Sequence, residues 1–427
     1  MAVQTGDVLD VTADKPASGG RMLARHDGQV ILVAGAIPGE RVTVRVTKAG
    51  KQVAFADVSG VLEASGDRRV PMTDPECGGC VYAHIAYARQ VRLKGEILRD
   101  AFVRIGRIPL HEDPAVSAGP EHAYRMRARF NVQDGRAGFY RENTHDTCDP
   151  RQTRQLSEDA IDAVEAAVRG LAAEGVTALS VELAENVAGD QRALHVDAAH
   201  TATIQPAIAR AVEEARLTGA TSSTTDGGTS AAGDPIVTDT LATLTNGRVV
   251  TGVLRRHPQA FFQANRFLVG SLVGEVMDAV APGPVLDLYA GVGLFSVAIA
   301  ASGHGGVTAV EGDAVSARDL ERNAAPFEEA LHVVRGSVES YLQRRPTAPP
   351  QTLIVDPPRT GMSKAAAESI VRSRAPRIVY VSCDPPTMAR DARRLLDAGY
   401  RLSSLRGLDL FPNTAHIESV GVFDLYL

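Results

Sequence analysis

A strand, a glycine turn and a helix in residues 284–300 constrain the fold of this chain more than any other feature. An apolar strand pattern over 284–290 runs into a turn with glycines at 291 and 293, and an apolar helical pattern follows. A second apolar strand ends at Glu311, about twenty residues after the turn, as in the first half of a doubly wound nucleotide-binding sheet. Because this alternation continues along residues 256–427, we expect a Rossmann-like C-terminal domain there.

The same glycine turn indicates which cofactor the sheet binds. The dinucleotide fingerprint has three glycines, whereas only Gly291 and Gly293 occur here, with Asp287 before them. Glu311 stands where an acid accepts hydrogen bonds from ribose hydroxyls. These features favour S-adenosylmethionine over NAD, with Tyr289, Gly291 and Glu311 as cofactor contacts. The alternative is a purely structural turn and a solvated strand end.

Two later strands end in residues that carry chemistry. Asp356 follows the apolar stretch 351–355 and precedes two prolines, and Cys383 follows the stretch 378–382. Carboxyl ends of parallel strands meet at the ligand-binding edge of such a sheet, so Asp356 and Cys383 should face one cleft. A thiol there suggests covalent catalysis on an electron-poor ring. The alternative, an inert core cysteine, is disfavoured because Cys383 lies beyond the apolar part of its strand.

A third candidate lies near the C-terminus. Alternation places His416 and Glu418 on one face at the start of a strand. A carboxylate beside a thiol nucleophile can act as a general base, and partial burial would raise its pKa. The alternative is an ordinary solvated strand end.

The first 255 residues follow other patterns. Residues 1–62 read as short strands broken by glycine turns, which is typical of a small OB-like β-barrel. Residues 63–255 are expected to form a central α+β domain. It is expected to begin with a helix over 85–106 that packs on the catalytic domain. The basic residues of this helix, Lys94 among them, lie largely between its apolar residues. Residues 218–235 lack large apolar side chains, which indicates a flexible surface loop. The expected fold class is multidomain α/β.

The net charge and the cysteines limit which partners and which cellular compartment are expected. A net charge of -6 argues against nonspecific coating of nucleic acid, so RNA contacts would need local basic patches. Residues 125–141 form one, with Arg125, Arg127 and Arg129 on one face of a strand, although a merely solvated face fits equally. Four cysteines without a regular framework favour reduced thiols over disulfides. No secretory signal and no membrane-length apolar run occur, so the expected compartment is cytoplasmic.

Taken together, these motifs resemble those of a known family. Residues 356–361, 378–383 with Thr387, 416–418 and 262–265 look like the motif set of the RNA uracil-C5 methyltransferases, which make 5-methyluridine in ribosomal or transfer RNA. Residues 1–62 are similar to the TRAM domain, a small RNA-binding barrel. The resemblance spans most of the chain and is weakest between 150 and 250.

The resemblance implies a mechanism and roles. Cys383 would attack C6 of the target uracil, and C5 would take the methyl group of S-adenosylmethionine. Glu418 would then remove the C5 proton, and elimination would release Cys383. Asp356 and Gln263 would hold the uracil edge or the cofactor. The target base would have to be extruded from folded RNA.

One departure concerns an iron–sulfur cluster. Many relatives bind a [4Fe-4S] cluster through four cysteines. Here Cys77 and Cys80 keep the spacing, but Pro71 stands at the first position and Cys148 precedes the fourth, near Thr153. Because the cluster prefers four thiolates, we expect none, and no other metal, with a three-cysteine remnant as the alternative.

Other functions remain open from the residues alone. An amino-group methyltransferase also carries an acid–Pro–Pro loop, but Arg359 replaces its aromatic residue and Cys383 would be unnecessary. A noncatalytic RNA-binding or folding protein is a further alternative. The TRAM resemblance favours 23S ribosomal RNA over transfer RNA as the substrate, since well-known bacterial transfer-RNA enzymes lack that domain. We expect a monomer, and the target uridine is not determined.

Overall fold

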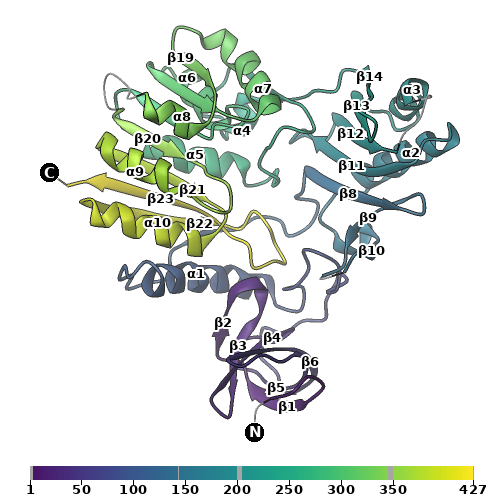
Figure 1. Ribbon diagram of the computed structural model, residues 1–427, viewed down its shortest axis with the longest axis vertical. Coiled ribbons are helices and arrows are strands. Elements are labelled where there is room, and N and C mark those ends of the chain that lie inside the picture. Colours follow the sequence, from purple (N-terminus) through teal and green to yellow (C-terminus); the bar gives the residue numbers. More distant parts are fainter. Residues whose placement is uncertain (1–2, 143, 200–203, 345–349, 427) are drawn as a thin grey trace.

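The computed structural model describes residues 3–142, 144–199, 204–344 and 350–426. Figure 1 shows an N-terminal barrel at the bottom, a central sheet at the right and a larger C-terminal domain at the upper left. Helix α1 (Tyr87–Arg104) runs between the barrel and the C-terminal domain. In the described part of the chain, no helix is both long enough and apolar enough to cross a membrane.

The barrel is a curled sheet with the strand order β1-β5-β6-β4-β3-β2. Its core strands contain the apolar runs expected from the sequence, and buried Glu40 accepts hydrogen bonds from Arg68 at its rim. The barrel elements are β1 (Val8–Thr12), β2 (Lys15–Pro16), η1 (Ser18–Gly20), β3 (Met22–His26), β4 (Gln29–Ala34), β5 (Arg41–Lys48) and β6 (Val53–Glu63).

The central domain places helices on one sheet of order β10-β9-β8-β11-β12-β13-β14. Its elements are β8 (Arg127–Gln133), β9 (Arg136–Tyr140), β10 (Thr147–Cys148), η2 (Pro150–Thr153), α2 (Glu158–Ala173), β11 (Ala178–Glu185), β12 (Arg192–Ala198), α3 (Ile204–Glu214), β13 (Gly219–Thr224) and β14 (Thr229–Gly233). The expectation of a flexible loop over 218–235 was wrong. Strands β13 and β14 form a hairpin there, and β13 also pairs in parallel with β12. Small side chains fit a sheet edge, and backbone pairing does not need large ones.

The alternation expected around β8 is present, but its cationic face is largely neutralised. Tyr124, Met126, Ala128 and Phe130 are buried on the opposite face. Arg127 and Arg129 lie within ion-pair distance of Glu182, at 3.5 and 3.3 Å, and Arg129 also reaches Asp197, while Arg125 donates to Gln155 at 2.6 Å. Most of these guanidinium groups are therefore engaged within the protein.

The C-terminal domain confirms the doubly wound sheet, with the order β19-β18-β17-β20-β21-β23-β22-β7. Strands from β19 to β21 run parallel, and β23 is antiparallel to both neighbours. Its elements are β7 (Val116–Ser117), α5 (Val269–Ala279), β17 (Val285–Leu288), α6 (Leu294–Ala301), β18 (Val307–Glu311), α7 (Ala314–Ala324), η3 (Ala325–Phe327), β19 (Leu331–Arg335), α8 (Val338–Gln343), β20 (Thr352–Val355), α9 (Lys364–Ser373), β21 (Arg377–Ser382), α10 (Pro385–Asp397), β22 (Tyr400–Leu408) and β23 (Glu418–Leu425).

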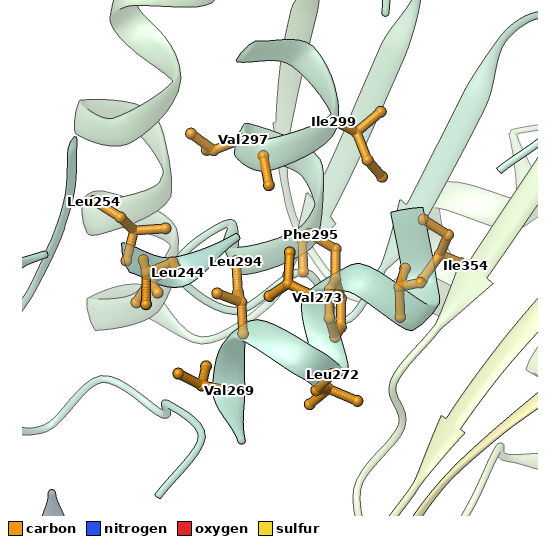
Figure 2. Close-up of a cluster of buried hydrophobic side chains, with 14 of the residues drawn as sticks. Leu244, Leu254, Val269, Leu272, Val273, Leu294, Phe295, Val297, Ile299 and Ile354 are labelled. Atoms are coloured by element: carbon orange, nitrogen blue, oxygen red, sulfur yellow. The ribbon is translucent and has the colours of Figure 1, made fainter. Parts of the chain in front are cut away.

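The C-terminal core extends further back in the sequence than the boundary expected at 255. The ribbon of β15 (Val237–Thr240) and β16 (Val253–Arg256), with α4 (Leu241–Leu244) between them, packs on this domain. Figure 2 shows Leu244 and Leu254 beside the apolar side chains of α5 and α6. The C-terminal core therefore includes Leu241, Leu244, Val249 and Leu254, whereas Val237 packs with Ala184 and Ala193 of the central sheet. The ribbon thus contacts both domains, and the boundary expected at 255 stays a prediction.

The expectation that all cysteines are reduced was wrong for one pair. Cys77 and Cys148 form a disulfide, with Cα atoms 5.9 Å apart. Cys77 makes a β-bridge to Arg141 while β10 pairs with β9, so tertiary pairing brings together two residues 71 positions apart. Cys80 is a buried free thiol beside them. Because only one of these three thiols is left unbonded, the arrangement does not fit a four-thiolate iron–sulfur cluster.

Candidate active site

The predicted site residues meet in one cavity of about 550 Å³ at the carboxyl edge of the parallel strands. They come from the turn after β17, the ends of β18, β20 and β21, the start of β23 and the segment before α5. The sequence-predicted residues that line it are Gln263, Tyr289, Gly291, Glu311, Asp356, Cys383 and Glu418. Asp287 lies below them at 0% exposure.

One end of the cavity is built for a nucleoside. Glu311 accepts hydrogen bonds from the backbone N–H groups of Gly291 at 2.7 Å and Asp313 at 2.6 Å, which orients its carboxylate. Gly291 has a φ of 58°, and a Cβ added there would meet only a carbonyl oxygen at 4.0 Å, so a ligand can approach the backbone. Gly293, in contrast, is packed against Leu320. The open backbone at Gly291 and the oriented carboxylate of Glu311 could hold the nucleoside part of S-adenosylmethionine.

The other end holds the thiol. Cys383 follows β21 and precedes α10, whose first turn is capped by Asp384 accepting from Thr387 N–H at 2.8 Å. Burial raises the pKa of Cys383 to about 11, the Glu418 carboxylate adds to the shift, and the Arg359 guanidinium opposes it. Without substrate the sulfur is therefore held as a protonated thiol at neutral pH.

Two carboxyl groups accompany the thiol. Glu418 is 3% exposed, and burial together with Asp356 raises its pKa well above the ordinary value, against Arg359. Burial and the charge of Asp287 raise the pKa of Asp356 to about 7. Gln263 Nε2 lies 3.5 Å from Asp356 Oδ2. Carboxyl groups with raised pKa values are suited to proton transfer.

The sequence-based site was incomplete. Phe261, Arg359 and Phe411 also line the cavity, as does Asp313 at its nucleoside end. Phe261 is 57% exposed, with Arg127 5.8 Å from its ring centroid, and so forms an open aromatic surface at the mouth. Phe261 directly precedes the recognised motif 262–265 and Arg359 lies within the motif 356–361, whereas Phe411 lies in a loop without any periodic signal.

A second cavity, of about 380 Å³, reaches Cys383 from the direction of the barrel. It is lined by Lys15 and Leu23 of the barrel, by Arg104 of α1 and by His416. Cys383 thus lines both cavities, one that contains the glycine turn and one that barrel residues help to form.

Known proteins are similar to this chain in both sequence and fold. Residues 2–59 match the family model described as TRAM domain, and residues 347–425 match the one described as tRNA (Uracil-5-)-methyltransferase. The chain is 31% identical to an uncharacterized RNA methyltransferase of Streptomyces avermitilis, with 98% of each chain covered. It is 33% identical to the 23S rRNA (uracil(1939)-C(5))-methyltransferase RlmD of Halomonas elongata, with 95% of this chain and 87% of that protein covered.

A solved structure extends the comparison to the whole fold. The Pyrococcus abyssi tRNA (uracil-54, C5)-methyltransferase in complex with S-adenosyl-L-homocysteine matches with a TM-score of 0.76 at 22% identity. The match covers 97% of this chain and 99% of that one. The chain therefore belongs to the family of S-adenosylmethionine-dependent RNA uracil-C5 methyltransferases that carry a TRAM domain.

Proposed function

We propose that this enzyme methylates C5 of a uridine in 23S ribosomal RNA through a covalent bond between Cys383 and C6 of the base. The observation that carries the proposal is the shared cavity: the partly buried thiol of Cys383 and the buried carboxyl group of Glu418 line one cavity together with the glycine turn at Gly291. Neither an amino-group transfer nor simple RNA binding needs that pair. The thiol is required because C5 of uracil is a poor nucleophile until a nucleophile adds at C6.

The proposed steps begin at sulfur. Cys383 loses its proton to solvent and its sulfur bonds to C6, while the C5–C6 π electrons move onto the C4 carbonyl oxygen. S-adenosylmethionine, when bound, supplies an electrophilic methyl group on a sulfonium. C5 bonds to that methyl carbon as the methyl–sulfonium bond breaks. Glu418 then takes the remaining C5 proton, the C5–C6 double bond re-forms and the Cys383–C6 bond breaks.

Neighbouring residues supply orientation and charge. Gln263 and Asp356 lie close enough to present an amide and a carboxyl group to the polar edge of uracil or to the cofactor. Arg359 lowers the pKa of both Cys383 and Glu418, which favours thiolate and carboxylate. Phe261 offers a stacking surface at the mouth for an unstacked base.

One observation supports ribosomal RNA as the substrate: a relative 33% identical over most of both chains is named as a 23S rRNA enzyme. The TRAM barrel does not discriminate between substrates, because the match to the Pyrococcus abyssi tRNA enzyme covers 97% of this chain. We propose that the RNA reaches Cys383 through the second cavity, because barrel residues line it while the nucleoside end of the first cavity is left for the cofactor.

The covalent step is tested with RNA in which the target uridine is 5-fluorouridine. Fluorine cannot be removed from C5 as a proton can, so the complex should stop at a methylated adduct that survives denaturing electrophoresis. Cys383→Ala should abolish the adduct, and Cys80→Ala, the matched change at the other unbonded cysteine, should retain it. An adduct that persists in Cys383→Ala overturns the proposal.

The RNA target is tested separately. Mapping 5-methyluridine in total RNA from cells with and without the gene should reveal one missing position in 23S ribosomal RNA. Loss of a transfer-RNA position instead would favour the alternative substrate. We also propose that a monomer suffices, because one chain supplies all of the proposed groups; light scattering combined with activity at low enzyme concentration tests this.

A further inference from the structure

The segment 409–417, between β22 and β23, delivers side chains to both cavities. Phe411 lines the cofactor cavity, whereas Thr414 and His416 line the cavity that faces the barrel. Glu418 follows at the start of β23 and is paired in register with Leu408 of β22. The position of Glu418 therefore depends on how this hairpin end is held.

A buried charge from another element holds one end of the segment. Lys94 of α1 is 0% exposed and its ammonium bonds both the carboxylate of Asp409, also 0% exposed, and the carbonyl oxygen of Phe411 at 2.9 Å. Burying such a pair costs several kcal/mol in desolvation, and an apolar pair of similar volume would often be as stable. Stability alone thus gives little reason for an ion pair here, whereas its directional bonds define the position of the chain.

A buried amide pair holds the middle of the segment. Gln90, also on α1 and fully buried, accepts from the N–H of Asn413 at 2.8 Å, and its Nε2 lies 2.9 Å from Asn413 Oδ1. Asn413 has a φ of 63°, a left-handed conformation that these contacts support. Gln90 and Lys94 are four residues apart and therefore share one face of the helix.

The helix itself is fixed between two cores. Leu93 packs with the barrel core, whereas Leu98 and Phe102 pack with the core of the C-terminal domain. Figure 1 shows α1 lying along β22 and α10, above the barrel. From the far side of the segment, Asn265 donates to the carbonyl oxygen of Leu410 at 3.1 Å. Arg69, which lies outside α1, also donates to Asn413 Oδ1 at 2.9 Å. The segment is therefore held from several sides, and α1 supplies the buried ion pair.

We propose that Lys94 and Gln90 are positioning residues of the methylation reaction, which hold the segment 409–417 so that Glu418 faces Cys383 in the geometry needed to remove the C5 proton. This inference rests on the proposed roles of Cys383 and Glu418. Neither α1 residue lines the cofactor cavity, so both act through the segment.

The test replaces the ion pair by an uncharged pair of similar size, Lys94→Met with Asp409→Leu, which avoids leaving one buried charge unpaired. The matched control is Arg99→Met with Asp113→Leu. It removes an ion pair of 3.2 Å between Arg99 of the same helix and Asp113 of the following loop, with both side chains about half exposed. Each protein is assayed for kcat, for KM of the RNA, for cofactor affinity and for covalent adduct on RNA with ordinary uridine.

We expect kcat of the Lys94–Asp409 double variant to fall about 10- to 100-fold, because a misplacement of about 1 Å can cost that much. KM and cofactor affinity should change less than about twofold. A covalent adduct should accumulate on ordinary RNA, since sulfur still adds while proton removal is slow. The control should behave like the unmodified enzyme. A merely structural role would not produce the adduct.

Two results would overturn the inference: a folded double variant with unchanged kcat, or one that loses kcat without accumulating adduct. Should the double variant not fold, Gln90→Met is held to the same two criteria. Failure here differs from failure of the proposed function, because the 5-fluorouridine adduct and its loss in Cys383→Ala do not depend on Lys94.

Discussion

The two halves of the cofactor cavity are built in different ways. Glu311 ends β18, and Asp356 and Cys383 directly follow β20 and β21, so the sheet itself places all three at one edge. Phe411 and the approach to Glu418 belong instead to a hairpin end that is held by α1, from residues 315 and 323 positions away in sequence. In the proposed mechanism, cofactor binding and nucleophilic attack therefore depend on local strand geometry, whereas proton removal depends on long-range packing.

The largest expected effect separates attack from proton removal. Glu418→Gln keeps the shape of the side chain but cannot accept a proton, so turnover should fall roughly 10²- to 10⁴-fold. Cys383 would still add to the base, and denaturing electrophoresis should show a covalent adduct on ordinary RNA. Near-normal turnover would instead assign the role of general base to Asp356. Proton removal would then no longer depend on the segment held by α1.

A smaller effect is expected at the nucleoside end. Glu311→Ala removes a carboxylate oriented by Gly291 and Asp313, and lost hydrogen bonds to a charged group cost about 1.5–3 kcal/mol. The Kd for S-adenosylmethionine should rise about 10- to 100-fold by calorimetry, with kcat at saturating cofactor little changed. Glu321→Ala, at an exposed acid of α7, is the control and should leave the Kd unchanged. An equal loss of kcat in Glu311→Ala would show that the halves are coupled.

Two substitutions at Asn413 test the part of the site that depends on the segment 409–417. Asn413→Gly keeps the left-handed backbone but loses the side-chain contacts, whereas Asn413→Ala also adds about 1–2 kcal/mol of backbone strain. We expect the alanine variant to have the lower Tm and the lower kcat, by about 3- to 10-fold relative to glycine. Equal kcat values would mean that the backbone of this segment does not matter for catalysis.

The smallest effect is a shift in pH dependence. Below its raised pKa, Glu418 is protonated and cannot act as a base, and below about pH 11 most Cys383 is a thiol, so kcat/KM should rise from pH 6 towards pH 9. Arg359 lowers both pKa values, so Arg359→Gln should move the rise to higher pH. A profile unchanged by that substitution contradicts the assigned electrostatics.

Much of the fold and of the site was predictable because it depends on local pattern. The doubly wound sheet and the place of Asp356 and Cys383 at one cleft follow from strand, turn and helix order. The same method failed where contacts are non-local. Lys94 was placed among the basic residues that lie largely between the apolar positions of the helix, yet it is buried against Asp409. The hairpin of β13 and β14 replaced an expected flexible loop.

The sequence by itself determined the fold class, the nucleoside-binding turn and the strand-end positions of Glu311, Asp356 and Cys383, because a strand's period and its terminating residue are encoded within a few neighbouring positions. Only the tertiary structure decided that Cys77 bonds Cys148, that most of the β8 arginines are engaged by neighbouring groups and that α1 anchors the segment before Glu418. Those contacts join residues tens to hundreds of positions apart. Their energy comes from burial and charge pairing in the assembled core, which leaves no periodic trace in the chain.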